Sequence, residues 1–205
     1  MIVSHQHKFI FIHIQKTAGS SISEYLKEHS QCEEIGKHWN ALAVRKFLGE
    51  KIWNEYFKFS FVRNPFDRLV SWYNMIASTK EDINGFFKYV HANADTFADF
   101  IEKCDQTVYE DDGIKSVRIP QFDYLSDEQG NLLIDFVGKF ENLEKDFKFI
   151  CEKIGLPYEG LNKINSYEHS AYENFYNESL LAKTEKIVKK DMEKFDYQKP
   201  ILPPN

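Results

Sequence analysis

KFIFIHIQKTAGSSI, residues 8–22, indicates the fold class because it contains the pattern of a strand, a small-residue loop and a helix start in succession. Residues 8–14 are apolar at nearly every position, which is typical of a strand buried on both faces of a parallel sheet. Ile22, Tyr25 and Leu26 follow at helical spacing and predict the buried stripe of a helix. The chain therefore opens with a strand–loop–helix unit.

A second strand–loop–helix segment follows further along the chain. Residues 58–62 predict a strand that ends at Arg63. Asn64 and Pro65 then form a strong helix start, with the asparagine as N-cap and the proline in the first turn. Ser71 lies eight positions after Arg63, about two turns into the predicted helix.

Further elements are expected along the rest of the chain. Apolar spacing predicts a short helix over 41–48 with Phe47 facing inward, a third strand over 132–137, and helices that end at Gly155 and near Phe195. Strands alternating with helices imply an α/β fold with a central, mostly parallel sheet flanked by helices. The two loops described above would lie at the carboxyl ends of strands, where such sheets bind ligands.

Bulk properties favour a globular protein without a transmembrane segment. We expect a single domain over 1–205, with a variable, mostly helical insertion at about 78–130. The net charge is −6 and no long run of Lys or Arg occurs, so nucleic-acid binding is not expected. Cys32, Cys104 and Cys151 form no CxxC pair, which is typical of reduced thiols in the cytoplasm. No apolar stretch approaches the roughly 20 residues of a membrane span, and no metal-ligand spacing is present.

The loop from Gln15 to Ser21 has the groups that an anion needs. Gly19 lets the backbone approach closely, and consecutive N–H groups precede the positive end of a helix. Ser20 and Ser21 add hydroxyls, and Lys16 adds a positive charge. The lysine precedes the glycine and no upstream glycine occurs, so this is not the GxxxxGK[ST] motif. Both an anion site and an ordinary polar turn fit the spacing.

The second loop offers a partner for the first. Arg63 at the end of a strand would suit a terminal phosphate, and the Ser71 hydroxyl could share the same oxygens. The alternative is that Arg63 pairs locally and that Ser71 is a small packing residue. Arg68 is a competing candidate, but we expect it on an exposed helix face, paired with an acid.

These two loops resemble those of a known family. IHIQKTAGSSI, residues 12–22, is similar to the 5'-phosphosulfate loop of sulfotransferases that use 3'-phosphoadenosine 5'-phosphosulfate (PAPS). FVRNPFDRLVS, residues 61–71, resembles their 3'-phosphate segment. Residues 135–143 and 156–197 also resemble the carbohydrate sulfotransferases that act on heparan and chondroitin, with their bacterial relatives. The resemblance implies a P-loop-like three-layer fold.

Two positions depart from the pattern of that branch. It usually has proline where Gln15 stands and threonine where Ser20 stands. Ser20 keeps a hydroxyl, whereas Gln15 adds an N–H and loosens φ, which would shift the loop slightly. Neither change removes a group that the resemblance requires.

The resemblance implies roles for individual residues. Lys16 would contact the sulfuryl group and the leaving phosphate, Arg63 and Ser71 would hold the 3'-phosphate, and Asn165 and Ser166 would lie in a late loop over the nucleotide. The residues implied in donor binding are Gln15, Lys16, Thr17, Ala18, Gly19, Ser20, Ser21, Arg63, Ser71, Asn165 and Ser166. The product would be adenosine 3',5'-bisphosphate (PAP), and no metal is required.

An acceptor hydroxyl would also need a base. His38 is the first candidate because the family's catalytic histidine lies in a similar interval, while His169 and Glu24 are weaker alternatives. His13, inside the first strand, is expected to be a core residue. The acceptor would be a glycan or a small metabolite, with its contacts in the insertion. Two other functions fit the residues: an ATP- or GTP-dependent kinase-like P-loop enzyme, and a non-catalytic nucleotide-binding protein of the same fold.

Overall fold

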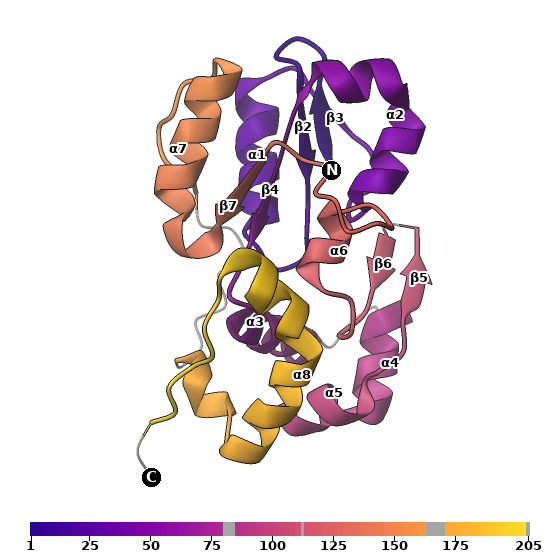
Figure 1. Ribbon diagram of the computed structural model, residues 1–205, viewed down its shortest axis with the longest axis vertical. Coiled ribbons are helices and arrows are strands. Elements are labelled where there is room, and N and C mark those ends of the chain that lie inside the picture. Colours follow the sequence, from indigo (N-terminus) through magenta and orange to yellow (C-terminus); the bar gives the residue numbers. More distant parts are fainter. Residues whose placement is uncertain (80–84, 112, 163–170, 204–205) are drawn as a thin grey trace. The chain divides into compact units, whose positions relative to one another are not determined.

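The chain forms two compact units in a computed structural model that describes residues 1–79, 85–111, 113–162 and 171–203 (Figure 1). The first unit comprises Met1–Arg63 and Gln121–Ser166, and the second comprises Asn64–Pro120 and Tyr167–Asn205. Among the described residues, no helix is long and apolar enough to cross a lipid bilayer.

A five-stranded sheet forms the centre of the first unit, in the order β3-β1-β2-β4-β7. Its strands are β1 (Ile2–Ser4), β2 (Phe9–Ile12), β3 (Glu33–Glu34), β4 (Phe57–Val62) and β7 (Phe136–Lys139). Strands β2, β4 and β7 pair in parallel, and β1 is antiparallel to both β2 and β3. Four of the five strands therefore run in one direction, which confirms the predicted mostly parallel α/β fold.

The third strand lies later in the chain than the sequence predicted. Residues 132–133 pair instead with the segment before them, because the Leu133 N–H donates to the Leu125 carbonyl at 2.8 Å and Leu132 forms a bridge with Ser126. The sheet register then begins at Phe136, opposite Phe59. The prediction of a strand over 132–137 was therefore wrong for its first four residues.

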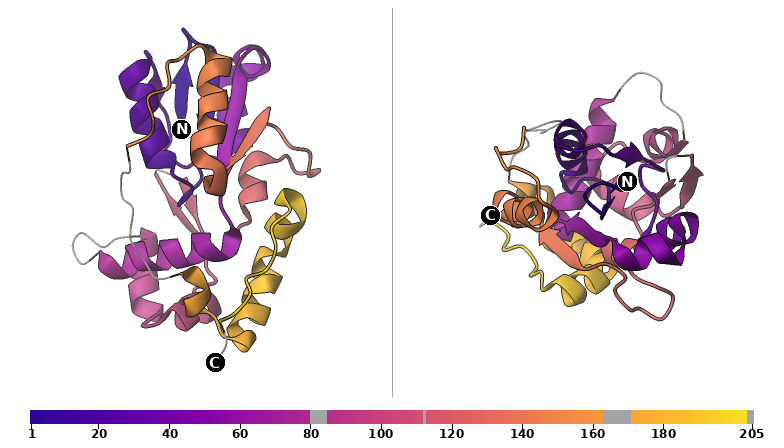
Figure 2. Two further views of the ribbon diagram at one scale, coloured as in Figure 1. Left: turned by 90° about the vertical axis from the view of Figure 1, so that its left-hand side faces the viewer. Right: turned by 90° about the horizontal axis from the view of Figure 1, so that it is seen from above.

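Helices cover both faces of this sheet (Figures 1 and 2). Phe9, Phe11, Phe59 and Phe61 point to one face, where they pack with α1 (Gly19–His29) and α7 (Leu143–Ile154). The Gly155 C-cap in the left-handed region ends α7 as predicted. The first unit also contains α2 (Ala41–Glu55), α6 (Gln121–Leu125) and the short 3-10 helix η1 (Phe140–Asn142).

Helix α2 is longer than the predicted 41–48 and kinks at Gly49, whose φ is +81°. Ala41 and Val44 are buried before the kink and Trp53 after it. Phe47 is 58% exposed, and the prediction that it faces inward was wrong.

The second unit is built from helices around one apolar core. Its helices are α3 (Pro65–Ser78), α4 (Gly85–Asn93), α5 (Phe97–Lys103), the 3-10 helix η2 (Tyr172–Phe175) and α8 (Glu178–Phe195). Large rings dominate the core, with Trp72 and Phe86 centred 5.2 Å apart. Helix α3 begins as predicted, because the Asn64 side chain accepts the Phe66 N–H at 3.0 Å and Pro65 occupies the first turn.

Arg68 corrects a sequence-based expectation. Its side chain is 2% exposed, with the guanidinium carbon 5.1 Å from the centre of the Trp72 ring. The prediction of an exposed helix residue was wrong, because an aromatic face on the same helix gives the cation a place in the core.

The insertion contains a hairpin that the sequence analysis missed. Strands β5 (Val108–Glu110) and β6 (Gly113–Lys115) pair beside α4 (Figure 1). The Glu110 carboxylate accepts the Phe86 N–H at 2.6 Å and forms an ion pair with Lys115. Glu110 therefore stabilises the N-terminus of α4, where a negative charge is favoured.

Candidate active site

The loop after β2 has an unusual backbone. Lys16 and Ala18 both lie in the left-handed region, with φ of 68° and 67°. Residues other than glycine rarely adopt this conformation, and each such residue costs about 1–3 kcal/mol. Left-handed residues alternating with their neighbours turn successive N–H groups toward one point, a concavity that binds anions. The loop thus has backbone strain of the kind found at anion sites.

Helix α1 begins directly after this loop without neutralising its own positive end. Ala18 provides no side-chain cap, and no acidic residue occupies the first turn. The first N–H groups of a helix have no intrahelical partner and attract negative charge. Ser20 and Ser21 lie in this turn. The Thr17 hydroxyl donates to the Ile14 carbonyl at 3.0 Å, so this side chain helps to fix the loop.

Arg63 and the loop both follow the carboxyl ends of neighbouring strands. Strands β2 and β4 are parallel, with Ile12 opposite Ser60, so their carboxyl ends lie within two residues of each other. The Arg63 Nη1 donates to the Lys16 carbonyl at 3.4 Å. Its guanidinium carbon also lies 4.1 Å from the centre of the Phe140 ring, which keeps the cation flat against an aromatic face.

A glutamine fixes the backbone of Arg63. The buried Gln121 side chain accepts the Arg63 N–H at 3.0 Å and donates to the Arg63 carbonyl at 2.9 Å. These two bonds replace the ones that a neighbouring strand would make. Sequence reasoning missed both Gln121 and Phe140 as positioning residues; the glutamine lies 58 positions away from the arginine and no local pattern connects them.

The electrostatics of Lys16 and Arg63 favour a bound anion. Burial, and then the nearby Arg63 charge, lowers the pKa of Lys16 from 10.5 to about 8. At neutral pH the ammonium therefore keeps most of its charge beside a second cation. An anion in the loop would relieve this repulsion.

His38 lies against the strand that leads into the loop. Its Nδ1 lies 3.1 Å from the His13 carbonyl oxygen, to which it donates as the protonated ring nitrogen. The two imidazole rings meet edge to face with centres 4.6 Å apart. This tautomer leaves the lone pair on Nε2, the atom that a general base uses.

His13 is a core residue, as predicted, and it explains why Gly19 is a glycine. The His13 side chain is 4% exposed, and burial together with His38 holds its pKa well below the ordinary value. A Cβ on residue 19 would lie 1.8 Å from the ring carbon Cδ2 of His13. The close approach of loop and strand therefore requires a residue without a side chain.

The remaining predicted site residues are not all brought together. The loop from Gln15 to Ser21, His38 and Arg63 belong to the first unit, whereas Ser71 is buried on α3 in the second. Asn165, Ser166 and His169 lie outside the described residues. Glu24 is exposed on α1. Among the residues that the structure does describe, no group of three or more His, Cys, Asp or Glu is placed to hold a metal ion.

Comparison with known proteins identifies the family. The family model described as "Sulfotransferase family" matches residues 1–198. The chain belongs to the sulfotransferase family. A protein of Archaeoglobus fulgidus, described as an uncharacterized protein, is similar in sequence: it is 29% identical to this chain over 135 residues, which cover 64% of this chain and 95% of that protein. No solved structure matches this sulfotransferase.

Proposed function

We propose that this sulfotransferase transfers a sulfuryl group from PAPS to an acceptor hydroxyl at the site formed by the β2–α1 loop, His38 and Arg63. The observation that carries the proposal is the convergence of two cations on a left-handed loop at a helix N-terminus. Membership of the family supports sulfuryl transfer in general. The use of PAPS is inferred from the family and from the anion-binding character of the loop.

The residues present fit a nucleotide with phosphate groups. The N–H groups of residues 17–21 would hold the 5'-phosphate, because this turn has neither a side-chain cap nor an acid. Arg63 would hold the 3'-phosphate through its planar fork, with Ser71 as a second contact. Asn165 and Ser166 remain predicted contacts of the nucleotide. PAPS supplies the activated sulfuryl group.

Lys16 would stabilise the charge that develops on the leaving phosphate oxygen. Its pKa of about 8 leaves it protonated at neutral pH, and its partly buried position strengthens the interaction with an anion. Positioned charges of this kind supply much of the rate enhancement in phosphoryl transfer, which sulfuryl transfer resembles.

His38 would act as general base for the acceptor. Because Nδ1 donates to the His13 carbonyl, Nε2 is the nitrogen that accepts a proton. The Nε2 atom would take the proton of the acceptor hydroxyl while the hydroxyl oxygen attacks the sulfur of PAPS. The neutral His13 ring beside it adds no competing charge at neutral pH. A base of this kind contributes about 10²–10⁴ in rate.

The acceptor and the setting are proposed on sequence grounds. Resemblance to the carbohydrate branch favours a sugar hydroxyl, and a small metabolite is the second candidate. We propose that both units form one sulfotransferase domain, since the family match runs through both. A reducing compartment such as the cytoplasm is proposed from the three free cysteines, Cys32, Cys104 and Cys151.

Thermal stabilisation by nucleotides tests donor binding. PAP is expected to raise the melting temperature more than ATP with Mg²⁺ does, because only PAP carries a 3'-phosphate for Arg63. The Arg63→Ala variant should lose most of this shift. Arg45→Ala is the control, since Arg45 forms a surface pair with Glu50 at 2.7 Å. A shift with ATP and none with PAP would indicate the kinase-like function instead.

Transfer of labelled sulfuryl groups from PAPS to a panel of sugar and metabolite hydroxyls tests catalysis. His38→Ala should lose turnover by at least about 100-fold while PAP still stabilises the variant. His29→Ala is a matched control, because His29 also lies with Nδ1 2.9 Å from a backbone carbonyl oxygen, that of Tyr25. Undiminished turnover in His38→Ala would remove His38 as the base. PAP binding without transfer to any acceptor would favour the non-catalytic binder.

A further inference from the structure

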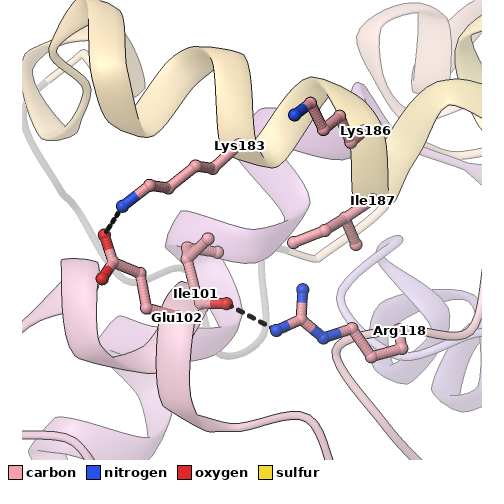
Figure 3. Close-up of a pocket in the computed structure, with 6 residues that line it drawn as sticks. All are labelled: Ile101, Glu102, Arg118, Lys183, Lys186 and Ile187. Atoms are coloured by element: carbon pink, nitrogen blue, oxygen red, sulfur yellow. Dashed lines mark hydrogen bonds and ion pairs between the residues drawn. The ribbon is translucent and has the colours of Figure 1, made fainter.

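The second unit contains a pocket that shares no residue with the candidate active site. Its volume is about 420 Å³, which is within the range of small-molecule sites. The walls come from α5, from the segment after β6 and from α8 (Figure 3). Its lining residues are Ile101, Glu102, Arg118, Lys183, Lys186 and Ile187.

Arg118 is the fixed cation of this pocket. Its Nη2 donates to the Ile101 carbonyl at 2.9 Å, and its backbone N–H donates to the Ser116 hydroxyl at 3.1 Å. Both acceptors are uncharged, and no carboxylate among the described residues forms an ion pair with Arg118. Figure 3 shows the guanidinium lying between the Ile101 carbonyl and the Ile187 side chain. The Ile101 carbonyl accepts one of the five N–H groups of the Arg118 guanidinium, so other N–H groups can donate to a ligand.

Two lysines on α8 add to this charge, and one acid offsets part of it. Lys183 and Lys186 lie one helical turn apart. The Lys183 ammonium pairs with the Glu102 carboxylate at 2.6 Å. Lys186 forms no ion pair within the part of the chain that the structure describes. The pocket therefore has an excess of two positive charges, in a chain whose net charge is −6.

Ile187 gives the pocket an apolar wall beside the cations. Its side chain is half-buried, whereas Ile101 is 1% exposed and offers the pocket its carbonyl, which binds Arg118. An inorganic ion would leave the Ile187 side chain in contact with water. An anion that carries a ring or a short aliphatic body would bury the wall and reach the guanidinium with its charged end, and each buried CH₂ group contributes about 0.8 kcal/mol.

We propose that this pocket binds a small organic anion, in which a carboxylate or a sulfate ester meets Arg118 and Lys186 and an apolar body packs on Ile187. A planar guanidinium fork suits two oxygens of one oxyanion. Glu102 weakens the binding of the anion because its carboxylate forms an ion pair with Lys183. The proposal goes beyond sulfuryl transfer and does not depend on it, because none of these residues belongs to the candidate donor site.

The test is a calorimetric titration of the full chain at low ionic strength, with PAP present in excess. The probes are benzoate, phenyl sulfate and inorganic sulfate, and benzamide is the uncharged control. Benzoate or phenyl sulfate should bind at least about tenfold more tightly than benzamide, since a hydrogen bond to a charged group contributes about 1.5–3 kcal/mol. Failure of both organic anions to bind would overturn the proposal. Equal affinity for phenyl sulfate and inorganic sulfate would overturn the apolar contact.

Variants identify the site. Arg118→Gln and Lys186→Gln should each weaken binding by about tenfold, while Lys189→Gln, on the same helix with a 72% exposed side chain, should not change it. Because Lys186 is exposed, Lys186→Gln should fold, and this variant tests the site even if Arg118→Gln unfolds. Glu102→Gln should tighten binding severalfold because it releases Lys183 from a surface pair. Unchanged affinity in all three pocket variants would refute the location.

Discussion

Gly19→Ala should destabilise the protein although it replaces a glycine at the start of a helix. An alanine in a helix is ordinarily better than glycine by about 0.5–1 kcal/mol. Here the added Cβ would lie 1.8 Å from Cδ2 and 2.0 Å from Nε2 of the His13 ring. The ring is 4% exposed and packs against Phe11 and His38, with ring centres 5.9 Å and 4.6 Å away. It therefore has little room to move.

The magnitude follows from the size of this overlap. Forcing an extra methyl into a packed core costs about 1–3 kcal/mol, sometimes more. Because the Cβ would lie 1.8 Å from a ring atom, we take the upper end of this range, about 3 kcal/mol, and after subtraction of the helix gain we expect a net loss of about 2 kcal/mol. For a chain of this size such a loss lowers the melting temperature by about 4–8 °C. Chemical denaturation followed by circular dichroism measures the free energy of unfolding.

A double-mutant cycle with His13→Ala isolates the cause. Removing the ring leaves space for the new methyl, so Gly19→Ala should cost at least about 1 kcal/mol less in the His13→Ala background. Glu24→Ala, at an exposed position of the same helix, serves as the control for substitution in α1. The reasoning is refuted if Gly19→Ala is as stable as the wild type, or if its cost is the same with and without the His13 ring.

Four further predictions concern Lys16, Gln121 and Asn64. Because the pKa of Lys16 is about 8 in the folded chain and 10.5 ordinarily, PAP affinity should fall as the pH rises through 8, and Lys16→Arg should flatten this fall in calorimetric titrations. Between pH 8 and 10.5 Lys16 is protonated in the unfolded chain and largely neutral in the folded chain. The free energy of unfolding of the ligand-free wild type should therefore rise with pH relative to that of Lys16→Met. A parallel pH dependence of the two proteins would contradict the lowered pKa of Lys16. Gln121→Ala removes the amide that binds the buried N–H and carbonyl of Arg63, so it should lower the free energy of unfolding by about 2 kcal/mol and weaken PAP binding. Unchanged PAP affinity would argue against a positioning role for Gln121. Asn64→Ala should cost about 1 kcal/mol in denaturation experiments through loss of the α3 N-cap, and Asn64→Asp should recover most of it.

Many helices and strands could be predicted from local patterns. The apolar run before the loop predicted a buried strand, and the Asn64-Pro65 start of α3 was confirmed because capping depends on neighbouring residues alone. Apolar spacing and the cap residues also predicted where α7 and α8 end, at Gly155 and near Phe195. The hairpin β5–β6 was missed because its short strands lack alternation, and their stability comes from contacts such as that of Glu110 with the start of α4.

The sequence alone predicted an anion-binding loop and a strand end that carries Arg63, because each depends on residue types within a short segment, whereas the choice of His38 came from the family resemblance. The contacts of these residues became known from the tertiary structure. It placed the Arg63 guanidinium on the Lys16 carbonyl and Phe140, fixed Arg63 through Gln121, and set the His38 tautomer through the His13 carbonyl. It also joined Arg118 to two lysines from α8 around one pocket. These contacts connect residues far apart in the chain, and such pairings depend on the packing of the whole unit, which no local spacing encodes.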